Sequence, residues 1–321
     1  MTTLKKLTVN AGPVGLLLVT LFACGLLDGR ILSAQNLIIV LSQSVPVLML
    51  ALGAFIVLLT GGIDLSAGVS VTLGSIVVAS VLSGGAALPI ALGTGLATIV
   101  GVGAVNGALV TIFRIPAFVA TLATMSGVQG VSLLLATRGV YVLSQPSLKQ
   151  LGTGRLGGLP ISVIAAVVVV AIAYVLVHHT RFGLRVYATG SDAAAAALAN
   201  VPIRAVLLLS YVAASCFTFL AAVMLIARTP IVTPNLGGQS LLLDAIAACV
   251  LGGTSIFGGR GTVVGVVAGA LIVSLFSNAL RVVGIDPSSL DFMKGALVIT
   301  ALVCDVGITR LRGRIFKEAI G

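Results

Sequence analysis

Long apolar stretches recur along nearly the whole chain, separated by short polar interruptions. Each approaches the roughly 20 residues that an α-helix needs to cross the hydrocarbon core of a bilayer. The stretches are continuous rather than alternating, which favours helices over a barrel, because a helix satisfies its own backbone hydrogen bonds. The sequence therefore predicts an all-α fold, a polytopic membrane helix bundle of about ten transmembrane helices formed by residues 1–321 as a single domain. The expected spans are approximately 11–27, 37–59, 65–83, 88–112, 116–136, 160–179, 204–227, 240–257, 262–283 and 290–309.

Composition and charge agree with a membrane location. Hydrophobic types make up 59% of the 321 residues and charged types only 8%, which is too little polar surface for a soluble domain of this size. Basic loop residues beside anionic headgroups explain the net charge of +10. Membrane lipids are therefore expected partners, and nucleic acid is not.

The distribution of basic residues predicts the orientation. An even number of spans places both termini on one side, and the positive-inside rule assigns that side to the cytoplasm. Most of the 18 Lys and Arg residues then lie inside, although the expected outer loop 137–159 is itself basic. The N-terminal segment, which follows a Lys-Lys pair, is expected to remain as an anchor rather than to be cleaved as a signal peptide.

Motifs for catalysis, metal binding and nucleotide hydrolysis are not found in the sequence. No Gly-Lys dipeptide occurs, so the chain carries no phosphate-binding loop of that type, and GTGRLG in a polar loop is interpreted as a chance match to the dinucleotide pattern. His178 and His179 are expected to be an interfacial pair. The four cysteines fall inside apolar segments and are expected to be small core residues. We expect no catalytic residue, no metal site and no cofactor in this chain.

A single carboxylate stands between two apolar segments, in the stretch GGIDLSAG. Gly61 and Gly62 allow a sharp turn there, and Asp64 is placed to cap the helix that follows. A second role, compatible with the first, is that the turn enters the membrane, where an ionisable group usually marks a pathway or a partner contact. Ser66 and Ser70 follow at helical spacing and add a narrow polar face that a hydroxylated solute could contact.

Other polar side chains inside the spans are candidates for a transport pathway, because a sugar gives up its hydration shell only where protein groups replace the lost hydrogen bonds. Thr121 and Gln129 are expected on one helix face, and Ser274, Asn278 and Arg281 recur at helical spacing along another. Ordinary interhelical hydrogen bonds are the alternative for each of them. The expected pathway residues are Asp64, Ser66, Ser70, Asn106, Thr121, Gln129, Ser274 and Asn278.

Some glycines and charges are expected to be structural. Gly103 and Gly107 lie four residues apart, as do glycines in GTVVGVVAG, and this spacing favours close packing of helices. Asp291 and Lys294 are spaced to form an ion pair, and Asp244 begins a span.

Five motifs occur in order between residues 61 and 265, and together they resemble the membrane permeases of sugar-type ABC importers, a group that includes ribose, xylose, arabinose and galactose permeases. The resemblance extends from about residue 37 to residue 309. The resemblance implies a multi-pass protein of the bacterial cytoplasmic (inner) membrane that imports a monosaccharide or a similar small polar solute. It also implies a second permease subunit, identical or paralogous, cytoplasmic subunits that bind ATP and Mg, and an extracytoplasmic sugar-binding protein. The motifs are GGIDLSAG (61–68), VNGALV (105–110), PAFVATLATM (116–125), RFGLRVYATG (181–190) and LDAIAACVLGGTSIFGGRGTVVG (243–265).

Residues 180–203 form the longest expected cytoplasmic loop, and in the permeases that this chain resembles the loop contacts the ATPase. Ser191 or Asp192 can cap a helix over residues 193–199, which is expected to dock on a partner because so short a helix is marginal alone. The alternative is a structural cap on the bundle. Where many relatives have Gly-Gly-Asn-Glu-Ala-Ala, this chain reads GSDAAA, so a salt bridge from that glutamate is absent. The expected coupling residues are Arg181, Phe182, Gly183, Gly190, Asp192, Ala195 and Asn200.

Basic residues of the outer loops are expected to meet an acidic rim of a binding protein, and the three candidates are Arg138, Arg155 and Arg228. Two alternatives for function stay open. One is a permease for amino acids or nucleosides in the same superfamily. The other is an ion-coupled secondary transporter, for which Asp64 is the plausible intramembrane carboxylate.

Overall fold

The computed structural model describes residues 3–136, 139–286, 289–290, 292–296 and 299–300, and these residues are mostly helical. Six helices are long and apolar enough to span a membrane: α2 (Ala34–Leu59), α4 (Leu88–Thr111), α5 (Ala117–Leu135), α7 (Ile161–His178), α10 (Ile203–Arg228) and α12 (Val263–Val282). Three more carry shorter apolar stretches: α1 (Thr3–Leu27), α3 (Ala67–Ser83) and α11 (Gly238–Leu251). These helices correspond to the first nine expected segments, but α11 ends at Leu251, so the expected end of the eighth segment at residue 257 is wrong. The tenth segment lies largely outside the described residues.

Helices α2 and α10 form the centre of the bundle. They pack against each other, and α4, α3, α11, α12 and α7 surround them. Nearly every side chain from Ser44 to Leu59 is buried, which is why α2 is apolar on all sides rather than along one stripe. Close approach depends on glycine, because a Cβ at Gly53 would lie 2.7 Å from the carbonyl oxygen of Ala214 in α10.

The glycine pairs identified in the sequence do pack helices closely. A Cβ at Gly103 of α4 would overlap the hydroxyl of Ser215 in α10, and one at Gly107 would lie 2.7 Å from a methyl group of Leu208. In the same way, a Cβ at Gly269 of α12 would overlap the carbonyl oxygen of Ala248 in α11. These small residues therefore allow the backbones of neighbouring helices to approach closely, as expected for helix packing in lipid.

Short elements build the connections. They are η1 (Gly29–Leu32), α6 (Pro146–Thr153), α8 (Arg181–Ser191), α9 (Ala193–Leu198), β1 (Tyr141–Val142), β2 (Arg155–Leu156), β3 (Leu159–Pro160) and β4 (Ile231–Val232). The expectation that residues 180–203 form a loop around one short helix is therefore wrong in part, because α8 and α9 together make most of this segment helical. Strand β1 pairs antiparallel with β4, and β2 pairs with β3 in a small hairpin.

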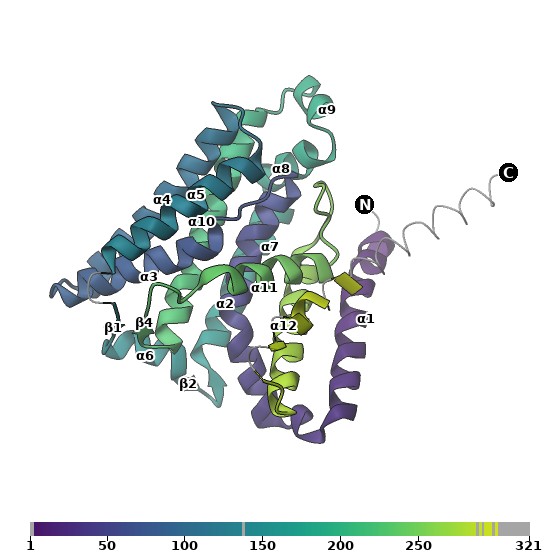
Figure 1. The fold of residues 1–321 in the computed structure, drawn as a ribbon. Helices are drawn as coiled ribbons and strands as arrows, with labels where there is room; N and C mark the ends of the chain where they lie inside the picture. Colours follow the sequence, from purple (N-terminus) through teal and green to yellow (C-terminus); the bar gives the residue numbers. More distant parts are fainter. Residues whose placement is uncertain (1–2, 137–138, 287–288, 291, 297–298, 301–321) are drawn as a thin grey trace.

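The two ends of the bundle carry different elements (Figure 1). Helices α8 and α9 lie at the upper end of the view, where α2 ends, whereas α6, β2 and β4 lie toward the lower end, where α10 and α12 end. The expected coupling segment and the expected outer loop are therefore at opposite ends of the bundle.

Two side chains differ from what the sequence predicted. Cys216 is exposed rather than part of the core, and Lys294 forms an ion pair with Asp244, with 2.9 Å between Nζ and Oδ2, while Asp291 lies outside the described residues.

Candidate functional site

The turn that joins α2 to α3 holds Asp64. Gly61 has a φ of +79°, a left-handed conformation that favours glycine, and it lets the chain reverse direction immediately after α2. The carboxylate oxygen Oδ1 of Asp64 accepts hydrogen bonds from the backbone N–H of Ser66 at 2.9 Å and from its hydroxyl at 2.6 Å. Ser66 is the N-cap residue of α3, but its own side chain makes no capping hydrogen bond. Asp64, two residues earlier, accepts the backbone N–H of Ser66 and so satisfies a free donor at the start of the helix.

Neighbouring helices hold this turn in place. The side-chain amide of Asn106 in α4 donates to the hydroxyl oxygen of Ser66 at 2.8 Å and lies 3.4 Å from Oδ1 of Asp64. The hydroxyl of Thr121 in α5 lies 3.1 Å from the carbonyl oxygen of Ile63. Four of the expected pathway residues are thus brought together by three helices and one turn.

Several polar atoms beside this network have no hydrogen-bond partner in the described part of the chain. They are Oδ1 of Asn106, Oγ of Ser70 and the phenolic oxygen of Tyr211, all buried. Sequence reasoning missed Tyr211, although a tyrosine in the middle of an apolar span could have been noticed. Buried atoms of this kind usually find a partner, so water or a ligand group could satisfy them when the protein functions.

We expect Asp64→Ala to lower the free energy of unfolding by about 3 kcal/mol, because two donors of Ser66 and one of Asn106 would lose their acceptor. Asp64→Asn is the matched control, since its amide oxygen can accept the same bonds. Thermal unfolding of the purified protein in detergent measures both effects. Equal melting temperatures for the two variants would show that the capping bonds do not hold the turn.

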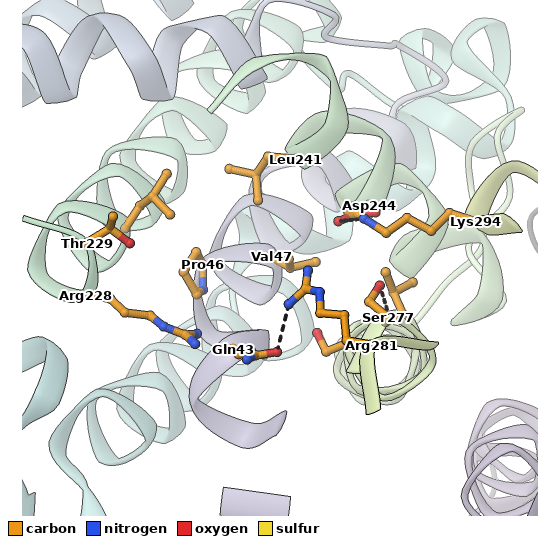
Figure 2. Close-up of a pocket in the computed structure, with 13 residues that line it drawn as sticks. Gln43, Pro46, Val47, Arg228, Thr229, Leu241, Asp244, Ser277, Arg281 and Lys294 are labelled. Atoms are coloured by element: carbon orange, nitrogen blue, oxygen red, sulfur yellow. Dashed lines mark hydrogen bonds and ion pairs between the residues drawn. The ribbon is translucent and has the colours of Figure 1, made fainter. Parts of the chain in front are cut away.

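A cavity of about 340 Å³ opens between α2, α10, α11 and α12. Figure 2 shows the guanidinium groups of Arg228 and Arg281 on either side of the amide of Gln43, with the Asp244–Lys294 pair at the far wall. Its remaining wall residues are Pro46, Val47, Leu225, Thr229, Leu241, Val273, Ser274 and Ser277.

The residues expected along one face of α12 separate in the structure. Ser274 and Arg281 line this cavity, whereas Oδ1 of Asn278 accepts a hydrogen bond from the side chain of Asn36 in α2 at 2.8 Å. Gln129 of α5 lines a different cavity, of about 470 Å³, beside Val69 of α3, Asn235 and residues 237–240. The expected pathway residues therefore lie in separate places, namely the Asp64 turn, the two cavities and the contact between Asn278 and Asn36, rather than in one continuous row.

Helix α9 has the position and caps expected of it. Oδ1 of Asp192 accepts from the backbone N–H groups of Ala194 at 2.9 Å and Ala195 at 3.0 Å, and Asn200 turns the chain with a φ of +59°. Asp192, rather than Ser191, is thus the cap. Within α9 only Ala196 is buried, and Leu198 is 89% exposed, so most of the helix surface faces away from the rest of the bundle.

Helix α8 connects α9 to the spanning helices. Its first turn follows Thr180, whose hydroxyl accepts from the N–H of Gly183 at 3.3 Å. A Cβ at Gly183 would overlap the carbonyl oxygen of Val177, and this close approach lets the chain turn sharply from α7 into α8. Arg181 and Phe182 lie in that first turn.

The far end of α8 contacts the end of α2. A Cβ at Gly190 would overlap the carbonyl oxygen of Leu59, and that same oxygen accepts a hydrogen bond from the N–H of Gly259 at 2.9 Å. The hydroxyl of Tyr187 donates to the carbonyl oxygen of Gly261 at 2.7 Å, and burial raises the pKa of Tyr187 to about 12. Helix α8, the end of α2 and the loop between α11 and α12 therefore form one interlocked unit, a few residues before Asp64.

The loop between α11 and α12 adds an exposed aromatic side chain at this end. Phe257 is 92% exposed, and it was not among the residues expected to contact a partner. An aromatic residue in a glycine-rich polar loop is a signal that could have pointed to a contact surface.

The three arginines expected to meet a binding protein occupy different environments. Arg155 is exposed on β2, and Arg228 lines the 340 Å³ cavity at the end of α10. Arg138 lies outside the described residues.

Comparison with known proteins identifies relatives over most of the chain. The family described as branched-chain amino acid transport system, permease component, matches residues 36–302. The ribose import permease protein RbsC of Bacillus subtilis (strain 168) is 35% identical over 302 residues, covering 92% of each chain. The galactofuranose transporter permease protein YtfT of Escherichia coli (strain K12) is 34% identical over 280 residues, covering 86% of this chain and 80% of the relative.

The autoinducer 2 import system permease protein LsrC of Escherichia coli O9:H4 (strain HS) is 35% identical over 284 residues, covering 88% of this chain and 82% of the relative. No solved structure matches the chain. Since the family match and the relatives extend across the helical bundle, the protein belongs to this family of transport permeases.

Proposed function

We propose that this chain is the permease subunit of an ATP-binding-cassette importer and forms the path for a monosaccharide or a similar small polar solute. The observation that carries the proposal is the match over 92% of the chain to a ribose import permease. Galactofuranose and autoinducer 2 permeases match at similar identity, so the class of solute is small and polar. The protein is a transport subunit of the bacterial cytoplasmic membrane rather than an enzyme.

Membership of the family implies a partner ATPase and a substrate-binding protein. We propose that ATP and Mg bind to the ATPase and that a second permease, identical or paralogous, completes the pore. Exposure of α9 and of Phe257 supports docking of the ATPase at this end, because apolar side chains exposed this fully are typical of contact surfaces. Motion imposed there would reach the Asp64 turn through α8 and the end of α2.

The proposed topology has about ten spans with both termini in the cytoplasm. Its support is the placement of α8 and α9 at one end of the bundle and of α6 and β2 at the other, as the alternation of inner and outer loops requires (Figure 1). Reporter fusions after residues 85, 157 and 200 test it, with the first two expected outside and the third inside.

Charge reversal tests the prediction that Arg138 and Arg155 contact the binding protein. We expect Arg138→Glu with Arg155→Glu to weaken stimulation of ATP hydrolysis by the binding protein at least roughly fivefold, because like charges would then face its acidic rim. Hydrolysis without binding protein is the control and should be unaltered. Unchanged stimulation at low and high salt would remove these two residues from the docking surface.

The experiment that tests the proposed function is copurification of the chain with its native partners, followed by a ligand screen of the associated binding protein. Binding of a pentose, hexose or related polyol by that protein supports the proposal. A binding protein that takes only amino acids or nucleosides would instead support the alternative within the same superfamily. Uptake that survives loss of ATP and collapses with an ion gradient would support a secondary transporter.

A further inference from the structure

The 340 Å³ cavity carries more positive charge than its own residues neutralise. Arg228, Arg281 and Lys294 line it together with one carboxylate, Asp244, which lies 2.9 Å from Lys294. Arg228 has no hydrogen bond or ion pair among the residues that the structure describes, and Arg281 contacts only the neutral amide of Gln43, at 3.5 Å. Two guanidinium groups therefore share a cavity without a carboxylate between them.

Such an arrangement is costly unless something else supplies negative charge. Both arginines lie in the last turn of membrane-spanning helices, α10 and α12, where Arg228 is half-buried and Arg281 is exposed. Apolar side chains of Pro46, Val47 and Val273 form part of the wall and lower the local dielectric, which strengthens the repulsion between like charges and the attraction of an anion.

The cavity also offers the geometry that an oxyanion requires. Figure 2 shows the two guanidinium groups flanking Gln43 and facing the same space. A guanidinium presents a planar fork of donors that matches the oxygens of a phosphate or carboxylate. Ser274, which lines the same space and is 6% exposed, offers a hydroxyl as a further donor.

We propose that this cavity is a binding site for a phosphate-type oxyanion, held between Arg228 and Arg281 with Ser274 as a neutral donor. The oxyanion can be free in solution, as inorganic phosphate or the charged end of a solute, or it can be the phosphate of a lipid headgroup. This site is separate from the Asp64 network and does not depend on which sugar is carried.

Thermal unfolding of the purified protein in a neutral maltoside detergent tests the proposal. Sodium phosphate is titrated against sodium chloride of equal ionic strength. We expect phosphate at tenfold its dissociation constant to raise the melting temperature of the wild type by about 3 °C more than chloride. In Arg228→Gln with Arg281→Gln, the apparent affinity for phosphate should fall at least roughly tenfold.

The matched control is Lys149→Gln with Arg155→Gln, which removes the same amount of charge from exposed positions at the same end of the bundle. It should respond to phosphate as the wild type does. If the double arginine variant does not fold, the single Arg281→Gln variant, altered at an exposed position, should still bind phosphate at least roughly threefold more weakly.

A second arm distinguishes the two sources of the oxyanion. Dihexanoylphosphatidylglycerol below its micellar concentration is compared with inorganic phosphate. Stabilisation at roughly tenfold lower concentration by the lipid than by phosphate assigns the site to a headgroup, and equal potency assigns it to a free oxyanion; both outcomes support the site. A phosphate response no larger than that to chloride, or one that persists unchanged in the arginine variants, overturns the proposal.

Discussion

Replacing Asp192 with proline is expected to reduce solute uptake by roughly 100-fold while the protein still inserts into the membrane. The backbone of Asp192 has a φ of −162°, far from the value near −65° that proline requires. Its N–H donates to the carbonyl oxygen of Ala188 at the end of α8, and its carboxylate caps α9. Loss of the backbone hydrogen bond and of the helix cap together costs about 3 kcal/mol. This corresponds to a ~100-fold decrease in the population of protein with α9 correctly placed.

The measurement is uptake of labelled solute by cells or vesicles, together with the amount of protein in the membrane. Asp192→Asn is the matched control, since asparagine also caps helices well and is expected to retain most of the uptake. A bulky change on the exposed face, Ala195→Trp, should likewise uncouple transport without altering insertion. Normal uptake in both the proline and tryptophan variants would separate α9 from coupling.

Replacing Gly190 with valine is expected to lower the free energy of unfolding by about 3 kcal/mol and to abolish coupling. A side chain at this position would overlap the carbonyl oxygen of Leu59, and its Cβ would lie 2.7 Å from the backbone nitrogen of Gly259. Both neighbours are backbone atoms in the interlocked unit, so neither can move aside as a flexible side chain could. Helix α8 would have to leave the end of α2.

The control for Gly190 is Gly130→Val in α5, where a Cβ would meet no atom within 4 Å. This variant should melt within a few degrees of the wild type, since valine is at least as favourable as glycine inside a helix. Measuring ATP hydrolysis of the assembled complex alongside stability separates the two effects of Gly190→Val. Full coupling in a stable Gly190→Val protein would show that the contact between α8 and α2 transmits no motion.

The spanning helices could be predicted from the sequence because hydrophobicity over about 20 residues is a local signal. The expected segments 88–112 and 262–283 differ from α4 and α12 by only a residue at some ends. Helix α9 was predictable for a related reason, since its cap and its terminating residues are adjacent in the chain.

Helix α8 was not predicted, although its buried residues Gly183, Val186 and Thr189 recur every three positions. Its glycines and β-branched residues have low helix propensity, and packing on α2, α7 and α10 overrides that preference. The period-three pattern was the signal that could have identified it.

No pattern of neighbouring residues in the sequence predicts the cavity of Figure 2. Gln43 of α2 and Arg281 of α12 are in contact although 238 residues separate them in the sequence. The partner of Lys294 is Asp244, 50 residues away, rather than a neighbour on the same helix. Contacts of this kind depend on how the helices pack, which hydrophobic periodicity alone does not specify.

The most direct test of the account is accumulation of a labelled solute that the associated binding protein takes, by proteoliposomes that contain this chain with its ATPase and binding protein. We predict accumulation against a gradient only when both partners and ATP are present, and none by the chain alone. Accumulation by the chain alone, driven by a proton or sodium gradient, would contradict the account.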